Sequence, residues 1–324
     1  MDDGENLPFP KACAHFPANG EQGGINAVVE ALCSPDSGAP NSVFRGAGWS
    51  LPPSREAIEE IIEGLRAVLF PGYFGSADLT RESLPYHVGG TLDRVRRGLQ
   101  EQIRRGLCFF CDGESQEKCS SCVSGSAEVT SIFLSRLPSI QTRLADDAIA
   151  AFEGDPAAAS ADETVFCYPG MLAITSHRLA HELHSLGVPL IPRIIAEHAH
   201  SLTGIDIHPG AVIGSRIFID HGTGVVIGES AVIGDRVRIY QGVTLGAKSF
   251  PLDEQGKSIK GVPRHPIVED DVVIYAGATI LGRIRIGRGS IIGGNVWLTN
   301  GVGPGSRVTQ AQSRSELFID GGGI

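Results

Sequence analysis

Two different hydrophobic periods divide the chain at about residue 200. Between residues 51 and 200, apolar residues recur at spacings of three and four, the pattern of amphipathic helices. This region is therefore predicted to be an all-helical domain. The stripes predict six helices: Ile58–Leu69, Leu92–Ile103, Val129–Phe133 ending before Pro138, Ile140–Phe152, Leu172–Leu186 and a short helix after Pro192.

Beyond Gly204 the hydrophobic period changes to six. One aliphatic set repeats with this step, a second set of small or aliphatic residues lies two positions earlier, and glycine often follows the first set. This unit is the hexapeptide signature of a parallel β-helix, whereas a β-sandwich would space its turns by about 8–12 residues. The first set comprises Ile207, Ile213, Ile219, Ile227, Ile233, Ile239, Leu245, Ile274, Ile280, Ile286, Ile292 and Leu298.

The distribution of glycine supports this division of the chain. Of 42 glycines, 23 lie in the last 124 residues, where a coiled chain needs many turns. Residues 1–50 carry Gly, Pro, Asn and Ser without a period, so we expect a poorly ordered leader and assign it no structure. The predicted fold class is α+β, with a helical domain over 51–200, a left-handed parallel β-helix over 201–302 and a flexible tail over 303–324.

The charge balance excludes several classes of partner. With 37 acidic and 27 basic residues, the net charge of −10 disfavours nucleic acid and anionic membrane surfaces. The chain shows neither a secretory signal nor an apolar run of 18 residues, so a cytoplasmic protein is expected. Seven cysteines form an odd set, which favours a reducing compartment over a disulfide framework.

The six-residue period fails at two places, and such insertions tend to carry the binding face of a solenoid. The step from Ile219 to Ile227 is eight, and the step from Leu245 to Ile274 is 29. The first break contains His221, and the second is predicted to form a loop from about Ala247 to Pro266. A histidine that leaves a regular coil can act as a general base.

A base of this kind needs a carboxylate that fixes its tautomer. The candidates in the sequence are Asp206, Asp220 and Asp155, and the six-residue period does not distinguish among them. The second break also carries a histidine beside a charged residue, the pair Arg264-His265. The chemistry is therefore expected at the two breaks.

Five motifs together resemble the serine O-acetyltransferase family. They are GDPAA at 154–158, TGIDIHPG at 203–210, FIDHGTGVVIGE at 218–229, YQGVTLG at 240–246 and RHP at 264–266. The resemblance covers about residues 127–303. It implies acetyl transfer from acetyl-CoA to the hydroxyl of L-serine, which gives O-acetylserine for cysteine biosynthesis.

The resemblance also implies roles for individual residues. The general base of the family matches His221 and its orienting carboxylate matches Asp206. The residues that hold the amino and carboxylate groups of serine match Asp155, Asp220, Arg264 and His265. These types suit the task, because carboxylates attract the substrate ammonium and a guanidinium pairs with a carboxylate.

On the CoA side, the resemblance points to Ala247 for an oxyanion donor and to Ala276-Gly277 for the pantetheine arm. Many family members have Gly-Gly where Gly246 is followed here by Ala247 and Lys248, and the loop over 249–262 is longer than the shortest family versions. Both features resemble a long-loop branch of the family. The resemblance further implies a homotrimer or hexamer with sites between neighbouring prisms.

The last residues end in a glycine run and Ile324. The resemblance implies that such a terminal isoleucine can dock into O-acetylserine sulfhydrylase, the partner in the cysteine synthase complex. A frayed tail is the alternative.

Two further clusters stand apart from this chemistry. Cys108, Cys111, Cys119 and Cys122 form two C-x-x-C pairs that could bind zinc, bind an iron–sulfur cluster, respond to oxidation or remain unpaired. Acetyl transfer itself needs no metal. A second group, His177, His181 and His184, lacks the zincin spacing and is predicted to be a partly buried polar stripe.

Other functions remain open on the same scaffold. The acceptor could be another hydroxyl compound, such as homoserine or a sugar. A zinc hydratase would need three ligating histidines, whereas only His221 and His265 lie at the breaks. A non-catalytic scaffold that binds the sulfhydrylase is the remaining alternative.

Overall fold

The computed structural model describes residues 25–33, 51–76, 78–110 and 119–310. The chain divides into two compact units, residues 1–49 and residues 50–324. The first unit contains one described helix, α1 (Ile25–Cys33), although no element is predicted for residues 1–50. All other described elements belong to the second unit.

Six described helices of the second unit carry the apolar stripes. In α2, the Ser54 hydroxyl accepts a hydrogen bond from the Ala57 N–H at 3.1 Å and so caps the first turn. Ile58, Ile62 and Leu65 of the same helix are buried. The six helices are α2 (Arg55–Leu69), α3 (Leu84–Phe109), α4 (Ser120–Gly154), α5 (Ala161–Cys167), α6 (Pro169–Ser185) and α7 (Ile191–Thr203).

The predicted helix break at Pro138 is wrong, because α4 runs through it as one helix of 35 residues. Proline removes one backbone hydrogen bond from a helix. Around it, the hydroxyls of Ser135, Ser139 and Thr142 donate to the carbonyls of Ile132, Arg136 and Pro138. A continuous buried stripe on both sides of the proline outweighs the lost bond, and it consists of Phe133, Leu137, Ile140 and Leu144.

Helix α5 is absent from the sequence-based prediction, although its start carries a recognisable signal. The Ser160 hydroxyl accepts a hydrogen bond from the Glu163 N–H, and the Glu163 carboxylate accepts one from the Ala159 N–H at 2.7 Å. This reciprocal arrangement is close to a capping box. The helix is too short for a hydrophobic period to appear.

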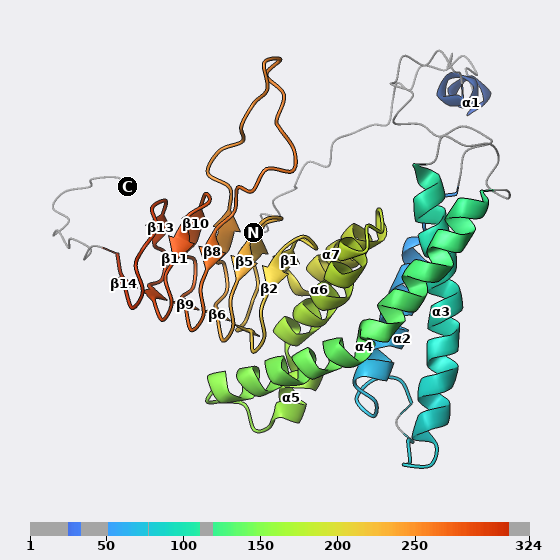
Figure 1. The fold of residues 1–324 in the computed structure, drawn as a ribbon, viewed down its shortest axis with the longest axis horizontal. Helices are drawn as coiled ribbons and strands as arrows, with labels where there is room; N and C mark the ends of the chain where they lie inside the picture. Colours follow the sequence, from blue (N-terminus) through green and yellow to red (C-terminus); the bar gives the residue numbers. More distant parts are fainter. Residues whose placement is uncertain (1–24, 34–50, 77, 111–118, 311–324) are drawn as a thin grey trace, which may run out of the picture. The chain divides into compact units, whose positions relative to one another are not determined.

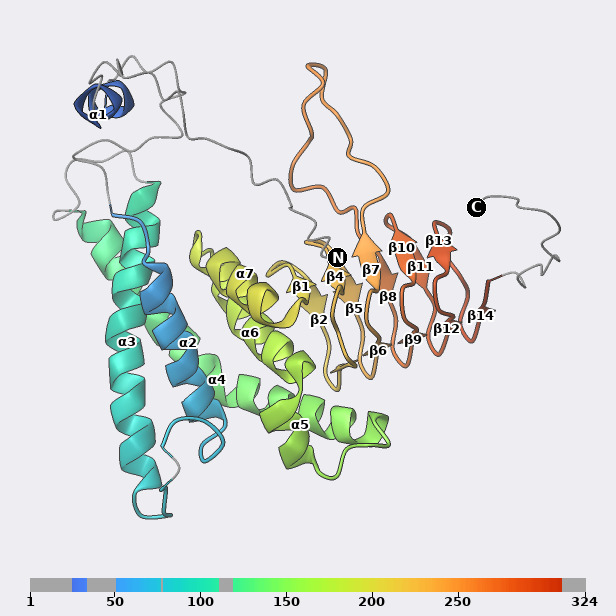
Figure 2. The same cartoon turned by 180° about the vertical axis from the view of Figure 1, so that it is seen from behind.

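The region after Gly204 is a left-handed parallel β-helix, as the six-residue period predicts (Figures 1 and 2). Its described strands form three parallel sheets, here called sheet 1 (β1-β4-β7-β10-β13), sheet 2 (β2-β5-β8-β11) and sheet 3 (β3-β6-β9-β12-β14). The strands are β1 (Asp206–Ile207), β2 (Val212–Ile213), β3 (Phe218–Ile219), β4 (Val226–Ile227), β5 (Val232–Ile233), β6 (Arg238–Ile239), β7 (Thr244–Gly246), β8 (Ile267–Val268), β9 (Val273–Ile274), β10 (Thr279–Leu281), β11 (Arg285–Ile286), β12 (Ile291–Ile292), β13 (Trp297–Leu298) and β14 (Arg307–Val308).

The aliphatic set predicted from the period fills the inside of the prism. Ile207 pairs in register with Ile227, Ile227 with Leu245, and Leu245 with Ile280. The side chains at these positions are buried, and they stack from coil to coil along sheet 1. Hydrophobic burial between neighbouring coils therefore fixes the register.

Left-handed backbone positions are stacked at two corners of the prism. At the corner between sheets 3 and 1 (corner 3/1), one residue of each coil stacks on the next, and these five residues have φ between 55° and 80°. At the corner between sheets 2 and 3 (corner 2/3), five residues have φ between 57° and 68°. The first stack is Gly204, Gly224, Gly242, Gly277 and Asn295, and the second is Arg216, Arg236, Asp271, Gly289 and Gly305.

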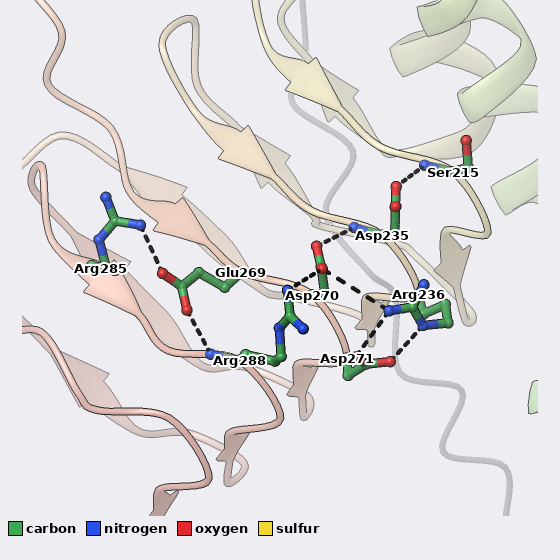
Figure 3. Close-up of polar contacts among 8 residues, drawn as sticks. All are labelled: Ser215, Asp235, Arg236, Glu269, Asp270, Asp271, Arg285 and Arg288. Atoms are coloured by element: carbon green, nitrogen blue, oxygen red, sulfur yellow. Dashed lines mark hydrogen bonds and ion pairs between the residues drawn. The ribbon is translucent and has the colours of Figure 1, made fainter.

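Corner 2/3 is also held by a ladder of charged side chains (Figure 3). Asp235 accepts a hydrogen bond from the Ser215 N–H at 2.8 Å, and Asp270 accepts one from the Asp235 N–H at 3.0 Å. Arg236 pairs with Asp271 at 2.6 Å, one coil further on. Each carboxylate thus accepts a hydrogen bond from a backbone or guanidinium donor of an adjacent coil, which supports the stack.

The periodic glycines that follow the aliphatic set have a different role from the corner glycines. None of Gly214, Gly228 and Gly234 has a positive φ, but a Cβ at these positions would lie 2.0–2.4 Å from atoms of the next coil. They are needed because the coils approach closely, rather than because of an unusual backbone angle. This corrects the expectation that the repeated glycines mark turns.

Replacing Gly234 with alanine is expected to destabilise the protein by about 1–3 kcal/mol. The new Cβ would lie 2.4 Å from Asp270 Oδ1 and 2.8 Å from the Asp270 backbone nitrogen. Gly303→Ala is the matched control, since a Cβ there would meet nothing within 4 Å beyond its chain neighbours. Urea unfolding monitored by circular dichroism gives both free energies, and equal values for the two variants would contradict the steric explanation.

Candidate active site

The first break of the period places His221 outside the prism. It lies between β3 and β4, has φ 57° and exposes about 70% of its side chain. Its Nδ1 atom lies 3.7 Å from Oδ1 of Asp220, whose side chain is only 16% exposed. A left-handed non-glycine residue outside the regular corner stacks is a strained position of the kind that clusters at functional sites.

The helical region brings a second carboxylate to this place. Asp155 is the C-cap of α4, where its Oδ2 accepts a hydrogen bond from the Tyr168 hydroxyl at 2.5 Å and its Oδ1 accepts one from the Ala157 N–H at 2.8 Å. Small residues permit this approach, because a Cβ at Gly154 would lie 2.5 Å from the Phe218 ring and one at Gly170 would lie 2.3 Å from the Ile219 carbonyl.

The pKa shifts in this cluster show that its groups interact with one another. The Tyr168 hydrogen bond, the Ala157 N–H and the charge of His221 lower the pKa of Asp155 below its ordinary value. The same hydrogen bond, together with burial and the nearby carboxylates, raises the pKa of Tyr168 to about 12. Asp155, Tyr168, Asp220 and His221 therefore form one electrostatic group. Sequence reasoning missed Tyr168, whose only signal is its position just before the proline that starts α6.

Asp206 lies at the same corner as His221, one coil earlier. It follows buried Ile205 and precedes buried Ile207, so its side chain lies on the outer side of β1. The two coils are tightly joined there, since the Gly224 N–H donates to the Gly204 carbonyl at 2.8 Å. Among the described hydrogen bonds and ion pairs, His221 contacts Asp220 and none joins it to Asp206.

The second break forms the loop over 247–266, which projects from the prism between β7 and β8 (Figures 1 and 2). At its end, Arg264 Nη1 lies 2.7 Å from Glu229 Oε2, and the Arg264 N–H donates to the Ser230 hydroxyl at 2.8 Å. The loop thus returns to the prism along residues 229–230 of the preceding coil.

His265 is held firmly at the same place. Its side chain is 6% exposed, and its Nδ1 atom accepts a hydrogen bond from the Ser230 N–H at 3.1 Å. The ring lies over Gly228, where a Cβ would be 2.0 Å from Cδ2 of the ring. Burial, with Arg264 next to it, lowers the pKa of His265, so the neutral ring is favoured.

One chain does not bring the two predicted halves of the site together. Asp155, Asp220 and His221 lie at corner 3/1, whereas Arg264 and His265 lie at the corner between sheets 1 and 2 (corner 1/2). These corners are the two edges of sheet 1. The residues of each half are held in place by contacts within one chain, but the width of sheet 1 separates the two halves.

The residues predicted for the CoA side are divided in the same way. Ala276-Gly277 lies at corner 3/1, where the Gly277 N–H donates to the Gln241 carbonyl at 2.9 Å, and Ala247 begins the loop at corner 1/2. Close by, the rings of Tyr240 and Tyr275 stack with centroids 5.1 Å apart. Sequence reasoning missed this stack, although the two tyrosines occupy the same position in successive coils.

The remaining candidates lie elsewhere or outside the description. Cys111 and Ile324 fall outside the described residues. His177 of the predicted histidine stripe is buried, and His181 Nδ1 lies 2.8 Å from the Pro209 carbonyl, so the stripe faces the first coil of the prism.

No helix among the described residues is long and apolar enough to cross a membrane.

Comparison with known proteins decides the family. Residues 265–300 match the family described as bacterial transferase hexapeptide (six repeats). A plasmid-encoded serine acetyltransferase of Synechococcus elongatus is 55% identical over 304 residues, which cover 93% of this chain and 95% of that protein. The chain belongs to the serine acetyltransferase family. The family predicted from the five motifs is thereby confirmed.

Other serine acetyltransferases agree with this conclusion. The enzyme of Mycobacterium tuberculosis is 52% identical over 167 residues, covering 52% of this chain and 69% of that protein. The structure of Entamoeba histolytica serine acetyltransferase 1 in complex with L-cysteine has a TM-score of 0.67 at 33% identity and covers 88% of this chain and 97% of that one. The soybean enzyme complexed with serine has a TM-score of 0.51 at 29% identity and covers 81% and 99%.

Proposed function

We propose that this serine acetyltransferase moves the acetyl group of acetyl-CoA to the hydroxyl of L-serine, with His221 as the general base. The observation that carries this proposal is an exposed histidine at a break in the prism, accompanied by Asp155 and Asp220. His221 takes the hydroxyl proton as the serine oxygen attacks the thioester carbon. The C–S bond then breaks, and the CoA sulfur leaves with that proton, which gives O-acetylserine and CoA.

The carboxylates of corner 3/1 suit the ammonium group of serine. The pKa of Asp155 is lowered by the Tyr168 hydrogen bond before other causes, so this carboxylate is ionised at neutral pH. Asp206, on the adjacent coil, would stabilise the imidazolium that forms on His221. Asp220, whose Oδ1 lies 3.7 Å from His221 Nδ1, would attract the substrate ammonium. The substrate ammonium would thus meet a negatively charged cluster beside the general base.

The carboxylate group of serine needs a cation, and Arg264 supplies one at corner 1/2, with His265 next to it. Because a single chain holds the two corners at opposite edges of sheet 1, we assign the complete site to two neighbouring copies. A closed ring of copies gives every half-site a partner, which favours a homotrimer or a hexamer made of two such rings. Arg264 would exchange Glu229 for the substrate carboxylate.

Acetyl-CoA would reach this site along sheet 1. The backbone N–H of Ala247 is our candidate donor to the oxyanion, and Ala276-Gly277 leaves room for the pantetheine arm. The catalytic steps above use side chains and backbone groups of the chain itself. Docking of the sulfhydrylase through the tail stays a prediction, because Ile324 lies outside the described residues.

The acceptor is tested by measuring CoA thiol release with acetyl-CoA and three acceptors: L-serine, L-homoserine and a sugar. L-Serine is expected to give the highest kcat/KM, and one extra methylene in the acceptor should lower it by about 10–200-fold. A higher value for homoserine or the sugar would overturn the choice of acceptor. Release with none of the three would support a scaffold without activity.

Replacing Tyr168 with phenylalanine is expected to raise the pKa of Asp155, because it removes the main hydrogen bond to the carboxylate. A carboxylate with a raised pKa is protonated at higher pH, so serine binding should weaken earlier as the pH falls. The dissociation constant for L-serine is measured between pH 3 and 7 in a His221→Asn background, which removes the titration of the base. Tyr86→Phe, at an exposed tyrosine, is the control. Identical profiles would separate Tyr168 from the site.

A further inference from the structure

Three cysteines converge where α3 ends and α4 begins. Cys108 is in the last turn of α3, Cys119 precedes α4 as its N-cap, and Cys122 is in the first turn of α4. Their Sγ atoms all lie within 4.8 Å of one another, and those of Cys119 and Cys122 are 3.1 Å apart. Within the part of the chain that the structure describes, this is the one group of His, Cys, Asp or Glu with metal-binding separations.

The convergence requires two helices and is therefore more than a sequence motif. Cys119 and Cys122 are three residues apart, which places them on the same side of one helical turn. Cys108 comes from α3, which packs against α4, and both Cys108 and Cys122 are buried. Three sulfur atoms thus meet in a protected position at one end of the α3–α4 pair.

Two sources of positive charge lie beside the sulfurs. The N-terminus of α4 places its first backbone N–H groups and the positive end of the helix dipole next to Cys119 and Cys122. The Arg104 guanidinium, which pairs with Glu101, also interacts with the Cys108 thiol. Such positive surroundings stabilise thiolates, which are the form that binds metal.

Burial acts in the opposite direction on the isolated thiols. Burial, together with hydrogen bonding to Cys119 and Cys108, raises the pKa of Cys122, which disfavours a free thiolate. A buried, protonated thiol is a poor nucleophile, which argues against a reactive cysteine. A disulfide between Cys119 and Cys122 would use two of the sulfurs and leave the convergence of Cys108 without explanation.

We propose that Cys108, Cys119 and Cys122 together bind a thiophilic divalent cation of the Zn²⁺ type. Tetrahedral Zn²⁺ with Zn–S bonds of about 2.3 Å holds its sulfurs about 3.8 Å apart, so the three thiols need to shift by about 1 Å. Binding forms three Zn–S bonds and releases three protons to solvent, which leaves the three-thiolate centre with one negative charge. Cys111, predicted as a fourth member, lies outside the described residues, and the proposal does not depend on it.

This centre is structural rather than catalytic because of its distance from the acetyl-transfer site. Cys119 and Asp155 lie at opposite ends of α4, whose 35 residues span about 50 Å at 1.5 Å per residue. A cation at the Cys119 end would join α3 to α4 and prevent the start of α4 from fraying. It would raise the melting temperature without changing the chemistry at His221.

The test is the metal content of the full-length protein, purified under reducing conditions and incubated with Zn²⁺ before exhaustive dialysis. Mass spectrometry of the metal is expected to give about one zinc per chain for the unaltered protein, and Cys122→Ser should lose most of it. Cys167→Ser is the matched control, because Cys167 is an exposed cysteine of α5. Tetrahedral thiolate bands on substitution with Co²⁺ would support the proposed ligands.

A second measurement keeps the proposal testable if Cys122→Ser does not fold. Titration of the unaltered holoprotein with a mercurial thiol reagent, followed by a zinc-sensitive dye, should release zinc in proportion to the thiols modified. The melting temperature should fall on release, with kcat for L-serine unchanged below that temperature. The proposal is overturned by absence of bound zinc, by equal zinc in Cys122→Ser, or by iron with acid-labile sulfide in its place.

Discussion

Replacing His221 with asparagine is expected to lower kcat/KM for L-serine by about 10²–10⁴-fold. The change removes the group that takes the hydroxyl proton. Asparagine tolerates the left-handed backbone that His221 adopts at φ 57°, so the strain of an alanine at this position is avoided. The rate is measured as CoA thiol release at saturating acetyl-CoA.

The control for this variant is His200→Asn. His200 is a half-exposed histidine of α7 whose Nδ1 lies 3.5 Å from Glu197, and it takes no part in the proposed chemistry. Affinity for acetyl-CoA and the oligomeric state should match the unaltered protein in both variants. Full activity of His221→Asn would refute the assignment of the base. A loss shared by His200→Asn would point to general damage.

The orienting carboxylate can be identified with the same assay. If Asp206 orients His221 in the assembled enzyme, Asp206→Asn should lower kcat and change KM little, because the imidazolium forms only in the transition state. Asp220→Asn should then act mainly on KM through the substrate ammonium. The opposite pattern would assign the orienting role to Asp220, whose carboxylate lies 3.7 Å from His221 Nδ1.

Replacing Asp147 with alanine is expected to destabilise the protein by about 3–5 kcal/mol. Asp147 and Arg178 are 0% and 4% exposed and form a two-pronged ion pair with distances of 2.7 and 2.9 Å. Asp147 also accepts the Ile217 N–H at 2.9 Å. Its loss leaves a buried guanidinium and a buried backbone donor without their partner.

The matched control is Glu153→Ala. Glu153 lies on the same helix and pairs with Arg216, next to Ile217, but both side chains of this pair are partly exposed. Its loss should cost about 0–1 kcal/mol. Denaturant unfolding measures both variants. Similar losses would show that burial does not set the contribution of these two ion pairs to stability.

The hydrophobic pattern predicts the prism well because each coil buries its own residues. Positions such as Ile227 and Leu245 are interior by their period alone, and the structure places them in one stack. The pattern fails at Pro138, where a local rule for proline competes with a buried stripe on both sides. It also fails at the seven residues of α5, which are too few for a period.

The candidate site shows a different limit of sequence reasoning. The two breaks of the period identify His221 and His265, but the step lengths do not show that these histidines lie at different corners. The corner at which a break falls depends on the sheets to which the strands before and after it belong. This assignment is known only once the strands are placed in the three sheets. Contacts from the helical region, such as Tyr168 with Asp155, depend on packing between distant segments and have no period to reveal them.

The loop over 247–266 leaves and rejoins the prism at one corner, and this has a consequence for how the enzyme can diversify. After the loop, Val268 pairs with Ile233 as if the coil had never been interrupted. Extending a 20-residue excursion by ten residues would cost only about 0.4 kcal/mol of closure entropy. Evolution can therefore change the length and composition of this loop, and with it the surroundings of Arg264, without changing the strand register of the β-helix.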